Sequence, residues 1–258
     1  MDILSIGNSF SQDATRYIHA IARADGETVN TANLYIGGCP LEKHFRNMHT
    51  NEKAYELQYN GSDTGFFVSL DEALLNRSWD VVTLQQKSAD SFDYDTFTPY
   101  ISSLAAHVRK LVPKARIFVH QTWSYEVFGE RIVKRAGTDD PWKILDMIVS
   151  SYAKAAKEIN ADGLIPSGEL FKSLFDHGIK KLHRDKYHAT LGCGRYALGL
   201  LWYRVICGKS VLGNTFRDFD EAVGEKEIKT VKKCVEAVKV KAPEEKEPRL
   251  KARRGKKI

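Results

Sequence analysis

The chain has 258 residues, of which 43% are apolar and 28% charged, so it is long enough to bury a substantial core and ordinary in composition for a globular protein. The formal net charge is +6, but eight Lys/Arg and only three Glu lie from Lys241 onward, so the rest of the chain is almost neutral. A near-neutral body argues against nucleic acid as the partner of the folded part, which would present a basic face.

The cysteines and the apolar runs exclude further classes of protein. Four cysteines, at positions 39, 193, 207 and 234, show no CxxC spacing and no Cys/His cluster, so we expect free thiols and no metal site. No apolar run is long enough to span a membrane, and the N-terminus lacks the charged and apolar regions of a signal peptide. As written, the sequence predicts a cytoplasmic protein with no membrane partner; a chain trimmed to its mature start, and hence secreted or periplasmic, would look the same.

The first dozen residues, MDILSIGNSFSQ, predict a buried strand over 2–6, a tight turn at Gly7-Asn8 and an amphipathic helix. Ser9 and Ser11 follow the turn. In an open α/β sheet, ligands bind where strands reach their carboxyl ends, which is the position that Ser9 takes here. The alternative interpretation is that Ser9 or Ser11 only caps the helix, because Ser is a favoured N-cap residue.

A second strand is predicted over 28–36, and it ends in the turn Gly37-Gly38-Cys39-Pro40. Glycines at such a turn let the backbone approach a ligand and leave amides free to donate hydrogen bonds. A simple turn would look the same. His44 follows closely and either faces this turn, as a substrate contact, or lies on the surface.

The next segment predicts a hairpin around Asn60-Gly61, a short helix over 71–76, and a compact strand over 80–84. Two amide side chains, Gln85 and Gln86, follow this strand directly. They would form hydrogen bonds within the loop or donate to developing negative charge on a substrate.

A helix over 98–111 precedes a buried strand over 116–120, which runs into Trp123 and Tyr125. This aromatic pair would form a platform for a substrate or cover an edge of the core. The mixed charges of residues 126–141 predict a mobile loop over the same face.

The alternation of strands and helices predicts βαβ units and a mostly parallel sheet of about five strands. The strands are expected over 2–6, 28–36, 80–84, 116–120 and 162–165, and the later helices over 141–159, 167–176, 192–207 and 225–240. We expect one domain over residues 1–242. Residues 243–258, rich in Pro, Glu, Lys and Arg, should be disordered, and they could dock the protein to RNA or to an anionic surface.

Asp185 and His188 form an Asp-x-x-His sequence between the last strand and the helix that starts near Gly192. Groups three residues apart lie on one side of a turn or helix. The carboxylate can hold the Nδ1 hydrogen of the imidazole and leave Nε2 to take a proton from a hydroxyl. Such pairs also cap helices, so the spacing alone does not decide the function.

With an early strand-end serine and a late Asp-x-x-His, the chain resembles the SGNH (GDSL-type) hydrolases over most of residues 1–210, and looks most like an uncharacterised branch that opens with GNSFS. The resemblance implies an α/β fold, a three-layer α/β/α sandwich of the flavodoxin-like SGNH type. It also implies that Ser9 is the nucleophile, that Gly38 contributes an oxyanion-hole amide beside that of Ser9, and that Asp185 and His188 complete a triad.

The chain departs from the family pattern in two places. Asn8 stands where the GDSL motif has Asp. The third block, usually Gly-x-Asn-Asp, is replaced by Leu84-Gln85-Gln86, in which Gln86 is the better match for the third oxyanion donor. This departure puts that donor in doubt, and removal of one such donor costs about a hundred- to a thousand-fold in rate.

The resemblance implies a serine esterase without cofactor or metal that hydrolyses short acyl esters, above all acetyl esters, of a small molecule or glycan. Gln85, His44, Trp123 and Tyr125 are the expected substrate contacts. A lipase- or thioesterase-like member and a non-catalytic glycan-binding module on the same fold are the alternatives. The sequence leaves the oligomeric state open.

Overall fold

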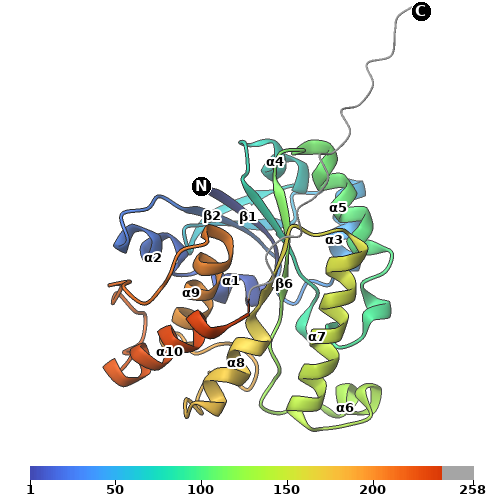
Figure 1. Ribbon diagram of the computed structural model, residues 1–258. Helices are drawn as coiled ribbons and strands as arrows, with labels where there is room; N and C mark the ends of the chain where they lie inside the picture. The colour runs from blue at the N-terminus through green and yellow to red at the C-terminus, as the bar shows by residue number, and fades with distance from the viewer. Residues whose placement is uncertain (240–258) are drawn as a thin grey trace, which may run out of the picture.

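The buried strands of the chain assemble into one sheet with helices on both sides. The computed structural model describes residues 1–239, and these form a seven-stranded sheet in the order β4-β3-β2-β1-β5-β6-β7 (Figure 1). Its strands are β1 (Asp2–Gly7), β2 (Asn30–Tyr35), β3 (Tyr55–Tyr59), β4 (Ser62–Val68), β5 (Val81–Leu84), β6 (Arg116–Gln121) and β7 (Gly163–Pro166).

Five neighbouring strands of this sheet run parallel, as the sequence predicted: β2, β1, β5, β6 and β7. β3 and β4 form an antiparallel hairpin that extends the β2 edge. Its turn is the predicted Asn60-Gly61 pair, and both residues have positive φ, which is typical of a two-residue hairpin turn.

The helices are α1 (Ser9–Thr15), α2 (Ile18–Ala24), α3 (Leu41–Thr50), α4 (Leu70–Leu75), α5 (Tyr100–Leu111), α6 (Glu130–Ala136), α7 (Pro141–Glu158), α8 (Ser167–Asp176), α9 (Cys193–Cys207) and α10 (Glu225–Ala237). Short 3₁₀ turns occur at Ser88–Asp90 and Tyr94–Thr96.

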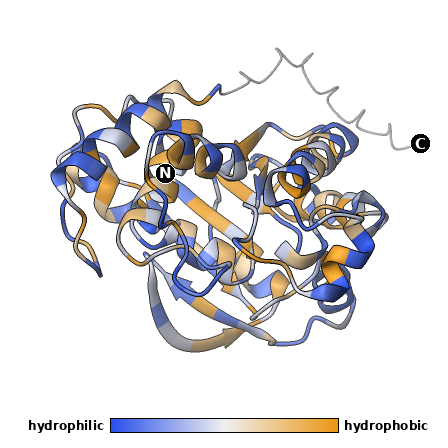
Figure 2. Ribbon diagram, turned by 90° about the horizontal axis from the view of Figure 1, so that it is seen from below, coloured by the Kyte–Doolittle hydropathy of each residue, from blue (hydrophilic) through white to orange (hydrophobic). Residues whose placement is uncertain are grey.

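Two hydrophobic cores lie on opposite faces of the sheet, because successive side chains of a strand point to opposite sides. Ile3 of β1 packs with α1, α2, α8, α9 and α10, whereas Leu4 and Ile6 pack with α3, α4, α5 and α7. In Figure 2, hydrophobic strands occupy the centre and the surrounding helices carry both hydrophobic and hydrophilic residues. The predicted three-layer α/β/α sandwich is therefore confirmed.

The expectation of a mobile loop over 126–141 was wrong in part, because α6 forms there between Gly129 and Gly137, which act as its N-cap and C-cap residues. All four cysteines are free, as predicted.

The predicted disordered tail, 243–258, lies outside the described residues. Within residues 1–239, no helix combines the length and apolar character needed to cross a membrane.

Candidate active site

Ser9 is presented by the tight connection between β1 and α1. Asn8 is the N-cap of α1: its Oδ1 accepts from the Phe10 N–H at 3.0 Å, and its own N–H donates to Ser11 Oγ at 3.0 Å. Gly7 is required here, because a Cβ at this position would lie 2.3 Å from Ser11 Oγ. Ser9 is thus the first residue of the helix and does not cap it, so its hydroxyl is available for other contacts.

His188 and Asp185 meet this hydroxyl from a loop far along the chain. His188 Nε2 lies 2.8 Å from Ser9 Oγ, and His188 Nδ1 lies 2.7 Å from Asp185 Oδ2. Because the carboxylate accepts the Nδ1 hydrogen, the lone pair of Nε2 faces the serine hydroxyl. The three side chains therefore have the order and the spacing of a nucleophile, a general base and a group that orients the base.

The charge of Asp185 suits its place as the group that orients the base. Burial raises the pKa of its carboxyl, but the hydrogen bonds from the ring and backbone N–H of His188, the charge interaction with that ring and the N–H of Tyr187 together lower it by more, so the pKa lies below its ordinary value. Asp185 is consequently ionised at neutral pH, and it stabilises the proton on Nδ1.

The 183–190 loop that carries the pair is held from the side of β6. Trp123 Nε1–H donates to the Tyr187 carbonyl at 2.8 Å, and the Glu126 N–H donates to the Lys186 carbonyl at 2.8 Å. Trp123 itself is fully buried between Phe10 and Phe171, with ring centroids 4.1 and 4.8 Å away. The expectation that Trp123 contacts substrate is therefore not supported, since its ring is part of the core.

The Gly37-Gly38 turn after β2 lies beside the start of α1. Asn8 Nδ2 donates to the Cys39 carbonyl at 3.1 Å, which ties the turn to the residue before Ser9. Gly38 is exposed, has φ +58°, and its N–H has no hydrogen-bond partner among residues 1–239. This amide is available to donate to a ligand.

A row of hydrogen bonds continues from this turn across the ends of all five parallel strands, in the order of the sheet. From Asn8 it passes to Gln85, whose Nε2 donates to Asn8 Oδ1 at 2.7 Å, and then to His120, whose Nδ1 lies 2.8 Å from Gln85 Oε1. It ends at Ser167, whose Oγ lies 3.1 Å from His120 Nε2. We call Cys39, Asn8, Gln85, His120 and Ser167 the strand-end row.

The strand-end row explains where Gln85 belongs. Its side chain is 1% exposed and both of its polar atoms are used within the row. The expectation that Gln85 contacts substrate is therefore not supported. Its role in the structure is to join the turn after β1 to the C-terminal end of β6.

His120 should make the stability of the protein depend on pH. Burial lowers its pKa from 6.5 to about 3, so between these values only the unfolded chain binds the proton. Stability from this group is complete above pH 6.5 and falls as the pH drops toward 3. Between pH 7 and pH 5 the loss is about 2 kcal/mol.

The variant His120→Asn keeps an N–H donor near Gln85 and removes the titration. We expect its free energy of unfolding in urea to fall by about 2 kcal/mol less than that of the wild type between pH 7 and pH 5. His44 and every other titrating group are present in both proteins, so they cancel in the comparison. Equal losses in the two proteins would mean that His120 does not stay neutral in the folded state.

Two further sequence-based candidates have partners away from the triad. Gln86 Nε2 donates to the Thr96 carbonyl at 2.7 Å and its Oε1 accepts from the Leu41 N–H at 2.9 Å, so the side chain is committed to holding loops together. It does not fit the third oxyanion donor. His44 is fully buried, 3.0 Å from the Tyr55 hydroxyl, and burial lowers its pKa to about 3, so it is a core residue and not a substrate contact.

Tyr125 lies nearer the triad, half-buried, with its hydroxyl 2.7 Å from Ser88 Oγ. Its neighbour Tyr187 was not predicted from the sequence. The Tyr187 ring is 39% exposed, and its centroid lies 4.3 Å from that of His188 and 5.2 Å from that of Tyr125. Its place next to His188 in the sequence is the only signal that could have suggested it.

Asp13 is the second residue that sequence patterns did not single out. It is fully buried on α1, four residues after Ser9, and pairs with Arg184 and Arg195. A charged residue on the inward face of a short helix is an unusual pattern, and that was the available signal. Within residues 1–239, no three His, Cys, Asp or Glu side chains gather closely enough to hold a metal ion.

Comparisons with known proteins agree on the fold. A family model described as "Domain of unknown function (DUF4886)" matches residues 2–237, and no curated protein matches the chain. A DUF4886 family protein from Bacteroides uniformis has a solved structure that is 29% identical, with a TM-score of 0.85, over 92% of this chain and 93% of that one.

Two solved structures are more distant. A proposed GDSL-like lipase from Parabacteroides merdae has a TM-score of 0.53 at 14% identity, over 81% of this chain and 96% of that one. An acetyl xylan esterase variant from Geobacillus stearothermophilus has a TM-score of 0.52 at 15% identity, over 80% of this chain and 94% of that one. The shared architecture is the SGNH hydrolase fold.

Proposed function

The chain belongs to the DUF4886 family and has the SGNH hydrolase fold, and from this premise we propose that it is a serine esterase that removes short acyl groups, above all acetyl, from carbohydrates. The observation that carries the proposal is the pair of contacts made by His188, 2.8 Å from Ser9 Oγ and 2.7 Å from Asp185 Oδ2. Structural neighbours of the same fold include a lipase-like protein and an acetyl xylan esterase, which supports ester hydrolysis in general.

In the proposed reaction, His188 Nε2 takes the proton of the Ser9 hydroxyl as Oγ attacks the ester carbonyl. The backbone N–H groups of Ser9 and Gly38 donate to the oxyanion of the tetrahedral intermediate. His188 then protonates the leaving alcohol, and an acyl-enzyme on Ser9 remains. Water, deprotonated by His188, releases the acid and restores the hydroxyl.

The surroundings of the triad favour a small acyl group. Phe10, the residue after Ser9, is 1% exposed and stacks on buried Trp123, so the protein's own rings fill the space behind the nucleophile. Tyr187 presents a partly exposed ring next to His188. Such a ring offers a flat apolar face to the alcohol side of the substrate, which suits a pyranose.

The test compares kcat/KM for 4-nitrophenyl acetate with kcat/KM for 4-nitrophenyl octanoate. It also measures the acetate released from acetylated xylan, and the wild type is labelled with a fluorophosphonate probe. We expect adduct mass on the Ser9 peptide and a kcat/KM for the acetyl ester at least about tenfold above that for the octanoyl ester. Tyr187→Ala should raise KM for the acetylated glycan and leave KM for the nitrophenyl ester almost unchanged. A preference for octanoyl would point to the lipase-like alternative.

A glycan-binding protein without catalysis is the second candidate, and one observation favours it. Gln86 is bonded to Thr96 and Leu41, so it leaves the oxyanion to the two backbone amides. Binding of acetylated xylan without release of acetate, and without fluorophosphonate labelling of Ser9, would establish this candidate and overturn the esterase.

A further inference from the structure

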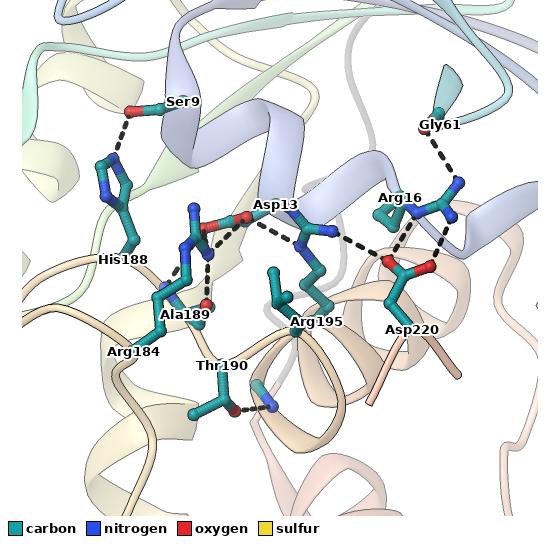
Figure 3. A network of polar contacts seen from close by, with 12 residues as sticks. Ser9, Asp13, Arg16, Gly61, Arg184, His188, Ala189, Thr190, Arg195 and Asp220 are labelled. Atoms are coloured by element: carbon teal, nitrogen blue, oxygen red, sulfur yellow. Dashed lines mark hydrogen bonds and ion pairs between the residues drawn. The ribbon is translucent and has the colours of Figure 1, made fainter. Parts of the chain in front are cut away.

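A chain of alternating charges runs beside the triad and links three parts of the fold. It consists of Arg184, Asp13, Arg195, Asp220 and Arg16, joined in that order by ion pairs (Figure 3). Asp13 is at its centre and fully buried, and the loop residue Arg184 forms one end. The other acid, Asp220, is joined to Arg195 of α9 and to Arg16.

Asp13 is saturated by donors. Arg184 Nη1 lies 2.9 Å from both carboxylate oxygens, Arg195 Nε lies 2.9 Å from Oδ1, and the Ala189 N–H donates to Oδ2 at 3.1 Å. Arg184 also donates to the Ala189 carbonyl, so it closes the loop on itself. A buried carboxylate is tolerated only when it is paired and hydrogen-bonded in this way.

The position of these donors relative to the triad gives Asp13 its importance. Ser9 and Asp13 are four residues apart on α1 and therefore lie on one side of it, one turn apart. Arg184 precedes Asp185 and Ala189 follows His188, so the two loop donors bracket the acid and the base. Figure 3 shows Ser9 and Asp13 on successive turns of the helix, with His188 directed at the first and Arg184 at the second.

We propose that Asp13 is a positioning residue that holds the 183–190 loop in register with the helix carrying the nucleophile, an inference that rests on the proposed function of Ser9 and His188. The contacts from the other side of the loop come from residues 123–126, which do not share an element with Ser9. Apart from the contacts that Ser9 and Phe10 make with His188 itself, the bonds of Asp13 are what join the loop to the nucleophile's own helix, so Asp13 sets the distance between Nε2 and Oγ. A misplacement of about 1 Å in such a geometry costs about a hundredfold in rate.

Asp220 provides the matched control. It is an acid of the same charge chain, and the hydrogen bond from Arg16 is the largest of the causes that lower its pKa to about 2. It bonds to Arg16, Arg195 and Tyr17, and to no residue of the 183–190 loop. Loss of either carboxylate breaks ion pairs, but only Asp13→Asn should release the loop.

The experiment measures kcat and KM for 4-nitrophenyl acetate and hydrogen exchange of the 183–190 segment in the wild type, Asp13→Asn and Asp220→Asn. We expect Asp13→Asn to lower kcat by about 10- to 100-fold with KM changed by less than about threefold, and to exchange faster in 183–190. Asp220→Asn should keep kcat within about threefold of the wild type and leave exchange in the loop unchanged.

Arg184→Ala and Arg184→Lys give a second approach if Asp13→Asn folds poorly, because Asp13 stays paired with Arg195 in both. Arg184→Ala should lower kcat in the same direction as Asp13→Asn, and Arg184→Lys should restore part of it. The inference is overturned if loop exchange is the same in Asp13→Asn and Asp220→Asn. With an active wild type, it is also overturned if the two variants have equal kcat values. A wild type inactive on every ester, with exchange in 183–190 still faster in Asp13→Asn, would overturn the esterase and support the positioning contact.

Discussion

Ser9→Ala is expected to lower kcat for 4-nitrophenyl acetate by about 10⁴- to 10⁶-fold, with little change in KM. The hydroxyl is the only atom group removed, and it is the one that His188 Nε2 approaches to 2.8 Å. Without it no acyl-enzyme forms, and the remaining rate reflects what the oxyanion donors and substrate binding contribute on their own. The measurement is initial-rate kinetics on purified protein, with fluorophosphonate labelling as a second readout.

Ser11→Ala is the matched control for this variant. Ser11 is the other serine of the same turn, and its Oγ bonds to Asn8 and to Asn33 Oδ1 without contact to His188. We expect it to cost about 1 kcal/mol of stability, as loss of a helix cap does, and to keep activity within about tenfold. His188→Ala should match Ser9→Ala, and the double variant should be no slower than either, because the two residues act as a unit. Substantial activity in Ser9→Ala would rule out this nucleophile.

Asp185→Asn is expected to lower kcat by about 10³- to 10⁴-fold at neutral pH, although the side chain keeps its size. The carboxylate accepts the Nδ1 hydrogen of His188 at 2.7 Å. An amide in its place can donate to Nδ1, which favours the tautomer with the hydrogen on Nε2, and that tautomer cannot accept the Ser9 proton. KM should stay nearly constant, because the change acts on proton transfer.

Asp176→Asn controls for the loss of an exposed carboxylate. Asp176 is exposed and pairs with Lys172 on α8, away from the triad, so its variant should keep kcat within about threefold. If Asp185→Asn retained a similar kcat, the bond from the His188 N–H to Asp185 Oδ1 would be its main role, and Asp185 would only shape the turn.

Much of the sheet and of the candidate site follows from local sequence patterns. Apolar runs that end at Gly7, Gly37 and Gln85 predicted the parallel strands and the edge at which their loops meet. The Asp-x-x-His spacing predicted that Asp185 and His188 can act together, and the resemblance to SGNH hydrolases connected them to Ser9. Periodicity and spacing are properties of a few neighbouring residues, so a single sequence contains them.

Tertiary structure alone decided which partners the polar and aromatic side chains find. Gln85 reaches Asn8, 77 residues away, and Asp13 reaches Arg195, 182 residues away, and no short pattern encodes such distances in sequence. The sequence left open whether Trp123 forms a substrate platform or covers an edge of the core, and its position between Phe10 and Phe171 made it core. The strands, the place of Ser9 and the Asp185–His188 pair were thus determined by local sequence. Burial and long-range hydrogen bonding set the strand-end row and the contacts of Asp13, because a buried polar group must find a partner wherever the fold brings one.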